Sequence, residues 1–221
     1  MANVINAESF RDPNAEWHHG GYSGCGNVTD LLGSLRGRAA VVVGSGGSIE
    51  EILDHYEAVR MKLKPAVFAI NDIGLYLPHV DHWLSLHNEK LRHWYGVKTC
   101  EERDHWERIK MHTAIGATGH LHYYWHGLCP LFALSGYFGM QVAWLMGCRP
   151  IVLVGCPGDD TRRFFAKEPR KGFHYGHGGS QSDNGMKRQL LDEMVRQPEF
   201  KASVRSMSGW TKDFFGGDEC L

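Results

Sequence analysis

The sequence has little of what marks a membrane or secreted protein. No apolar run approaches the roughly 18 residues that a helix needs to cross a bilayer. The segment Met1–Asn14 is polar and lacks the basic-then-apolar layout of a signal peptide. The six cysteines form no Cys-x-x-Cys pair, which is typical of reduced thiols rather than of a disulfide framework. These absences predict a cytoplasmic protein without a membrane partner.

Excess charge of one sign is also missing. The 24 basic and 25 acidic residues give a formal net charge of −1, which predicts no broad surface for nucleic-acid backbones. The 221 residues are 43% hydrophobic and 22% charged, as in an ordinary globular domain. Histidine, with 14 copies, is the residue type that stands out.

Short apolar runs alternate with helical patterns along most of the chain. Strands are predicted at Ala39–Val43, Ala66–Ile70, Asp81–Leu86, His120–Trp125 and Pro150–Gly155. Helices are predicted at Ile49–Leu63, Cys100–Lys110, Ser135–Cys148 and Gly185–Gln197. This alternation predicts an α/β fold, a Rossmann-like parallel sheet flanked by helices.

Two segments lack periodicity and set the predicted domain organisation. Residues 1–37 are predicted to form an irregular N-terminal arm with a short helix near Thr29–Leu35. Residues 38–221 are predicted to form a single α/β nucleotide-binding domain. Within it, residues 156–184 are predicted to form a long flexible lid loop, followed near the end by a C-terminal tail.

A glycine-rich stretch follows the first predicted strand and opens the first predicted helix. It consists of Gly44, Ser45, Gly46, Gly47 and Ser48. Glycine lets the backbone approach a ligand, and a helix start offers N–H groups to an anion, so we predict a nucleotide-binding loop. The stretch lacks the Gly-Lys-Ser/Thr ending of a P-loop, and Ile49 replaces the third glycine of the dinucleotide fingerprint. A tight turn is the alternative, and Ser48 and Glu51 have the spacing of a capping box.

Two further stretches are candidates for the same edge of the sheet. Asn71 and Asp72 close the second predicted strand, where the Asn71 amide suits a base or a ribose. Ser135 and Gly136 open a later helix, whose first N–H groups suit a phosphate. Each has a structural alternative, because Asn is common in turns and Ser is common as a helix N-cap.

Three motifs resemble, in order and spacing, the bacterial sialyltransferase-like superfamily. The motifs are Val41–Ile49, Phe68–Asn71 and Ser135–Gly155, and the similarity spans roughly residues 38–184. The superfamily includes the CMP-sialic-acid transferases of glycosyltransferase family 42, the motility accessory factor proteins and the hydroxymethylpterin diphosphokinase-like proteins. The resemblance implies that the glycine loop, the strand-end Asn and the Ser-Gly helix start hold the nucleotide.

The resemblance also implies which residues carry the chemistry. A histidine in the late loop would act as general base, for which His174 and His177 are the candidates. Three further side chains of that loop are candidates to stabilise the departing phosphate, namely Arg162, Arg163 and Tyr175.

The leading hypothesis is a nucleotide-dependent transferase, a glycosyltransferase that uses a nucleotide-sugar donor, a His base and no metal. One alternative is a Mg²⁺-dependent pyrophosphokinase, with Asp72, Asp159 and Asp160 as candidate carboxylates. The other is a non-catalytic nucleotide-binding protein. The acceptor stays open among a small molecule, a protein and a modified nucleic-acid base, as does assembly into a homo-oligomer.

Histidines also cluster at His120, His122 and His126. Strand alternation places His120 and His122 on one face, where they could hold a metal. No cysteine or carboxylate stands nearby at structural-zinc spacing, so half-buried packing with hydrogen-bonded ring nitrogens is the favoured interpretation.

Overall fold

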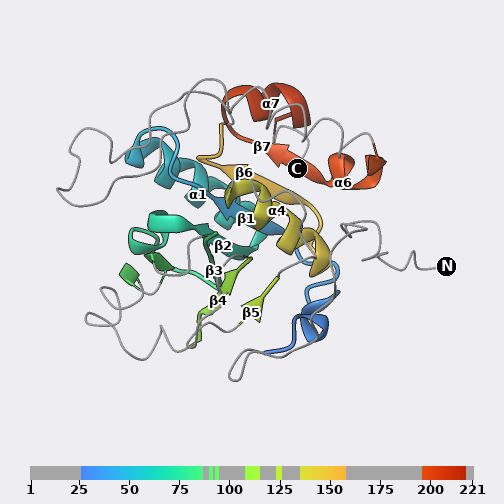
Figure 1. Ribbon diagram of the computed structural model, residues 1–221. Coiled ribbons are helices and arrows are strands. Elements are labelled where there is room, and N and C mark those ends of the chain that lie inside the picture. Colours follow the sequence, from blue (N-terminus) through green and yellow to red (C-terminus); the bar gives the residue numbers. More distant parts are fainter. Residues whose placement is uncertain are drawn as a thin grey trace, which may run out of the picture.

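A parallel β-sheet organises the part of the chain that the structure describes. The computed structural model describes residues 26–86, 90, 91, 93, 94, 108–114, 123–125, 135–157 and 196–217. Within them, seven parallel strands form one sheet in the order β5-β4-β3-β2-β1-β6-β7 (Figure 1). The strands are β1 (Ala40–Val43), β2 (Ala66–Ile70), β3 (His82–Leu84), β4 (Lys110–Thr113), β5 (Tyr123–Tyr124), β6 (Ile151–Val154) and β7 (Val204–Ser206). The predicted α/β fold with a Rossmann-like parallel sheet is confirmed.

Helices pack on both faces of this sheet. On one face lies α1 (Ile49–Leu63), whose buried side chains recur at helical spacing and share a core with β1 and β6. The other face is covered by α4 (Ser135–Leu145) (Figure 1). A Cβ on Gly139 would collide with Ile70 and approach Val42, so glycine lets α4 lie close to the sheet. None of the described helices is long and apolar enough to cross a membrane.

The structure corrects the sequence interpretation at two places. The predicted helix Cys100–Lys110 is wrong at its described end, because Lys110 begins β4. That strand carries Lys110 and His112 on one face, so no apolar run signals it. The predicted C-terminal tail is also wrong, because α6 (Pro198–Ser203), β7 and α7 (Gly209–Phe215) follow one another there. A three-residue edge strand is too short for its alternation to show in the sequence.

The described end of the N-terminal arm is hydrogen-bonded to the last turn of α4. A 3-10 helix, η2 (Val28–Leu31), stands where the sequence predicts a short helix. Asn27 caps it, because Asn27 Oδ1 accepts a hydrogen bond of 3.0 Å from Thr29 N. Gly33 N then donates to Leu145 O at 2.9 Å, which ties the arm to the last turn of α4.

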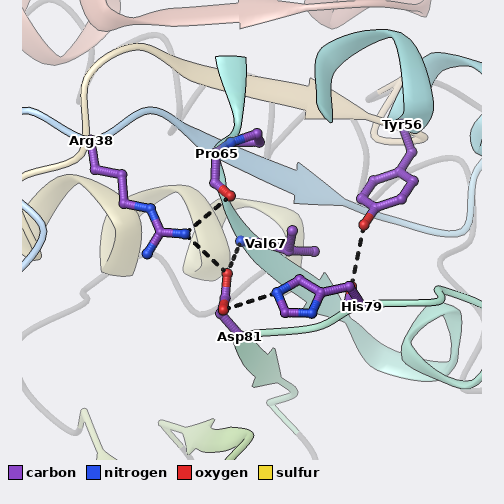
Figure 2. Close-up of polar contacts among 6 residues, drawn as sticks. All are labelled: Arg38, Tyr56, Pro65, Val67, His79 and Asp81. Atoms are coloured by element: carbon purple, nitrogen blue, oxygen red, sulfur yellow. Dashed lines mark hydrogen bonds and ion pairs between the residues drawn. The ribbon is translucent and has the colours of Figure 1, made fainter. Parts of the chain in front are cut away.

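Asp81 joins the amino ends of three neighbouring strands (Figure 2). Asp81 Oδ2 accepts a hydrogen bond of 2.9 Å from Val67 N in β2 and lies 3.7 Å from Arg38 Nη2, just before β1. Asp81 Oδ1 lies 3.1 Å from His79 Nε2. Arg38 Nη2 also donates to Pro65 O at 3.4 Å. Polar contacts thus fasten the amino edge of the sheet, opposite the edge that carries the predicted ligand-binding loops.

Two buried histidines form a hydrogen-bonded chain across β3, β4 and the end of β5. Trp125 Nε1 donates to His112 Nδ1 at 3.0 Å, so a neutral His112 carries its proton on Nε2. His112 Nε2 then donates to His82 Nδ1 at 2.9 Å. The His82 ring stacks on Phe68, with centroids 4.4 Å apart. Burial lowers the pKa of His82 to about 3, so this ring stays neutral at physiological pH.

Candidate functional site

The carboxyl edge of the sheet contains a topological switch point between β1 and β6. From β1 the chain adds β2, β3, β4 and β5 on one side and then places β6 on the other side of β1. In open α/β sheets ligands bind where the strand order reverses, because the loops on the two sides diverge there. Those loops are residues 44–48 after β1 and residues 155–157 after β6. The fold therefore places the predicted glycine loop at the switch point.

The loops after β1 and β6 meet backbone to backbone. Gly46 N donates a hydrogen bond of 2.9 Å to Gly155 O. A Cβ on Gly44 would lie 2.5 Å from Gly155 O and 2.6 Å from Cys156 Sγ, closer than real carbon contacts allow. A Cβ on Gly46 would lie 2.6 Å from Pro157 Cδ. Both positions therefore need glycine for the two loops to meet as they do.

The other residues of the glycine loop either cap helix α1 or have backbone N–H groups that can bind a ligand. Ser48 Oγ accepts a hydrogen bond of 3.1 Å from Glu51 N, so the predicted capping role of Ser48 is confirmed. Gly47 has a φ of +109°, which few residues other than glycine adopt. Among the described residues, neither Ser45 N nor Gly47 N has a hydrogen-bond acceptor. These two N–H groups are donors that the loop can offer to a ligand.

Asn71 and Asp72 begin the 3-10 helix η3 (Asn71–Leu75) at the end of β2, next to β1. Asn71 adopts a left-handed backbone, with a φ of +58°. Its side-chain Oδ1 accepts a hydrogen bond of 2.9 Å from Ser85 Oγ, and its backbone O accepts one from Trp83 Nε1. Asp72 is buried. Asn71 therefore joins the ends of β2 and β3, and its role in binding a base or a ribose stays a prediction.

The start of α4 lies against the residue that follows β6. Ser135 and Gly136 open this helix as predicted. A Cβ on Gly136 would lie 3.3 Å from Cys156 Sγ, so the first turn of α4 borders the switch point. From α7, Thr211 Oγ1 donates a hydrogen bond of 2.8 Å to Cys156 O. Cys156 thus lies where β1, β6, α4 and α7 converge.

The Cys156 thiol packs against the glycine loop and the first turn of α4. Burial raises the pKa of the thiol to about 12, although a hydrogen bond with the Gly44 backbone opposes the shift. A thiol with so high a pKa stays protonated and unreactive at neutral pH. Gly155, Cys156 and Thr211 border the site and are not among the residues predicted from the sequence. A glycine directly after the clearest strand is the signal for the first two, and no signal points to Thr211.

Several predicted residues lie outside the described part of the chain. They are the candidate bases His174 and His177, the candidate phosphate ligands Arg162, Arg163 and Tyr175, the carboxylates Asp159 and Asp160, and the cluster His120, His122 and His126. Their roles stay predictions, as does the lid over most of residues 156–184. Within the described residues, no group of three or more His, Cys, Asp or Glu side chains could hold a metal ion.

Comparison with solved structures shows a weak similarity. No protein-family model matches the sequence, and no curated protein matches it. One solved structure to which the chain is similar is that of the MAf glycosyltransferase from Magnetospirillum magneticum AMB-1, at 14% identity and a TM-score of 0.40. The match covers 60% of this chain and 28% of that one, so the chain spans less than a third of that protein's length. A similarity this low carries no argument about fold or function.

Proposed function

We propose that the protein is a nucleotide-dependent transferase, specifically a glycosyltransferase whose nucleotide-sugar donor binds at the switch point. The observation that carries the proposal is the backbone contact between the loops after β1 and β6. Glycines at 44 and 46 bring these loops together at the sheet edge where open α/β proteins bind ligands. Two N–H groups without acceptors among the described residues, Ser45 N and Gly47 N, belong to the same loop.

The two helix starts at this edge differ in charge, which suggests how the donor lies. The first turn of α1 contains Glu50 and Glu51, which would repel a phosphate bound directly on it. The first turn of α4 contains no acidic residue and lies against Cys156. A helix start without acidic residues attracts anions, so the donor phosphate belongs beside Ser135 and Gly136. The base or ribose then belongs beside the glycine loop.

The proposed reaction is a displacement at the anomeric carbon of the donor sugar. A hydroxyl oxygen of the acceptor forms the new bond to this carbon, and the bond to the nucleotide phosphate breaks. His174 or His177 would take the hydroxyl proton, and Arg162, Arg163 or Tyr175 would stabilise the departing phosphate. No metal is needed in this scheme, because cationic side chains balance the charge of the leaving group.

A binding screen tests the proposal without assuming an acceptor. Purified protein is heated with ATP and with CMP, UDP and GDP, the last three each alone and as a sugar conjugate, in EDTA and in Mg²⁺. A ligand that binds the native state raises Tm by mass action. We expect a nucleotide-sugar to raise Tm equally in EDTA and in Mg²⁺. A shift by ATP that requires Mg²⁺ would favour the pyrophosphokinase alternative, and no shift with any nucleotide would refute the proposal.

A further inference from the structure

Two polar side chains of α4 are buried without a hydrogen-bond partner in the part of the chain that the structure describes. Among these residues, neither the Tyr137 hydroxyl nor either amide atom of Gln141 has a partner. Tyr137 is 5% exposed and Gln141 is 0% exposed. Folded proteins rarely leave such groups unpaired, because the lost bonds to water are not replaced. Three unpaired atoms on one helix therefore point to a partner that arrives with a ligand.

These two side chains share one face of α4. Residues four positions apart on a helix lie one above the other, so Tyr137 and Gln141 are neighbours along the axis. Gly139 is half a turn from both, and it lies against Ile70 and Val42 of the sheet. The pair is therefore on the face of α4 that is turned away from the sheet.

This pair continues the site that begins at the switch point. Tyr137 directly follows Gly136, whose added Cβ would lie 3.3 Å from Cys156 Sγ. Burial raises the pKa of Tyr137, so its hydroxyl stays protonated. An electrostatic interaction with Cys156 adds a smaller contribution to the same shift. Gln141 lies one helical turn farther along α4, on the same face.

The chemistry of the pair selects a neutral, hydroxyl-bearing group. A carboxamide presents one donor group beside one acceptor, and a phenol can both donate and accept. The other α4 side chains from Phe138 to Leu145 are apolar. A phosphate would call for cationic donors, whereas carbohydrate hydroxyls both donate and accept and match these neutral groups.

We propose that Tyr137 and Gln141 bind the carbohydrate part of a ligand whose nucleotide part lies at the switch point. The inference rests on the proposed function, and it adds the two side chains that would recognise the sugar. Their polar atoms have no partner among the described residues, and the sugar hydroxyls supply hydrogen bonds to them.

Stability of the ligand-free protein gives the first test. Tyr137→Phe and Gln141→Met keep the side-chain shape and remove the unpaired atoms, so each should raise Tm by about 2–4 °C. Thr211→Val is the matched control, because the Thr211 hydroxyl is buried and already hydrogen-bonded, and it should lower Tm. A lower Tm for both α4 variants would show that their polar atoms are already bonded, for example to buried water, and would overturn the inference.

Ligand binding gives the second test and separates this inference from the proposed function. The probes are CMP with CMP-N-acetylneuraminate, UDP with UDP-N-acetylglucosamine, and GDP with GDP-mannose, titrated by calorimetry. The wild type should bind one conjugate more tightly than its nucleotide, and each α4 variant should reduce that preference about tenfold while nucleotide affinity stays unchanged. A preference kept by both variants overturns the inference and leaves the proposed function standing. No binding of any probe to the wild type overturns both.

Discussion

A single methyl group at position 44 tests how tightly the loops after β1 and β6 meet. The Cβ of Gly44→Ala would lie 2.5 Å from Gly155 O and 2.6 Å from Cys156 Sγ. Non-bonded heavy atoms make contact at about 3.5 Å, so the two loops would have to separate by about 1 Å. That movement weakens the hydrogen bonds from Gly44 N to Val154 O, at 2.7 Å, and from Gly46 N to Gly155 O, at 2.9 Å.

Overpacking and the two weakened hydrogen bonds together determine how much stability Gly44→Ala loses. Overpacking of a close-packed site costs about 1–3 kcal/mol. Each weakened hydrogen bond costs up to about 1 kcal/mol. We therefore expect Gly44→Ala to lower the free energy of unfolding by about 2–4 kcal/mol, and to lower Tm by about 5–15 °C for a domain of this size.

Urea denaturation followed by circular dichroism measures the loss, and Gly136→Ala is the matched control. Its added Cβ would lie 3.3 Å from Cys156 Sγ, a side-chain atom rather than a backbone carbonyl. Alanine is also a better helix former than glycine in α4, so this variant should stay within about 1 kcal/mol of the wild type. Equal stability of the two variants would refute the close contact at position 44.

Three further predictions concern the frame around the site. Because burial lowers the folded pKa of His82 to about 3 from the ordinary imidazole value of 6.5, its contribution to stability is complete above pH 6.5 and declines as pH falls toward 3. The expected slope in urea denaturation between pH 6 and pH 4 is at most about 1.4 kcal/mol per pH unit, and a slope unchanged in His82→Gln would contradict this. Asp81→Ala removes the acceptor of Val67 N and should cost about 1–3 kcal/mol, whereas Asp81→Asn keeps an acceptor oxygen and should cost less; equal losses would count against the Asp81 contacts. Asn71→Ala and Asn71→Gly both lose the hydrogen bond from Ser85, but only alanine strains the left-handed backbone at this position. Thermal unfolding should therefore show Asn71→Gly to be about 1 kcal/mol more stable than Asn71→Ala.

The strands that could be predicted are those buried on both faces. All four residues of β1 and of β6 and all five of β2 are buried, so each reads as a continuous apolar run. In β4, His112 interrupts the apolar run, and its ring is accommodated by Trp125 and His82, which lie far from it in sequence. The alternation of residue types within one strand cannot show partners of that kind.

The candidate site also has a part that the sequence predicts and a part that only the structure shows. The sequence places the glycine loop between a strand and a helix, and the structure confirms that position. The sequence does not show that Gly155 and Cys156 contact this loop, because that contact depends on β6 lying beside β1. For the same reason, Gln141 reads as one polar residue in an apolar helix, and its lack of a partner among the described residues appears only in three dimensions.

Amide hydrogen exchange tests the central claim most directly, namely that a nucleotide-sugar binds at the switch point. Ser45 N and Gly47 N have no acceptor among the described residues, so their amides should exchange fast in the free protein. With a saturating nucleotide-sugar, the account predicts slower exchange at residues 44–48, at Gly155 and Cys156, and in the first turn of α4. Protection confined to the amino edge around Asp81, or unchanged exchange at residues 44–48 with every nucleotide-sugar, would contradict it.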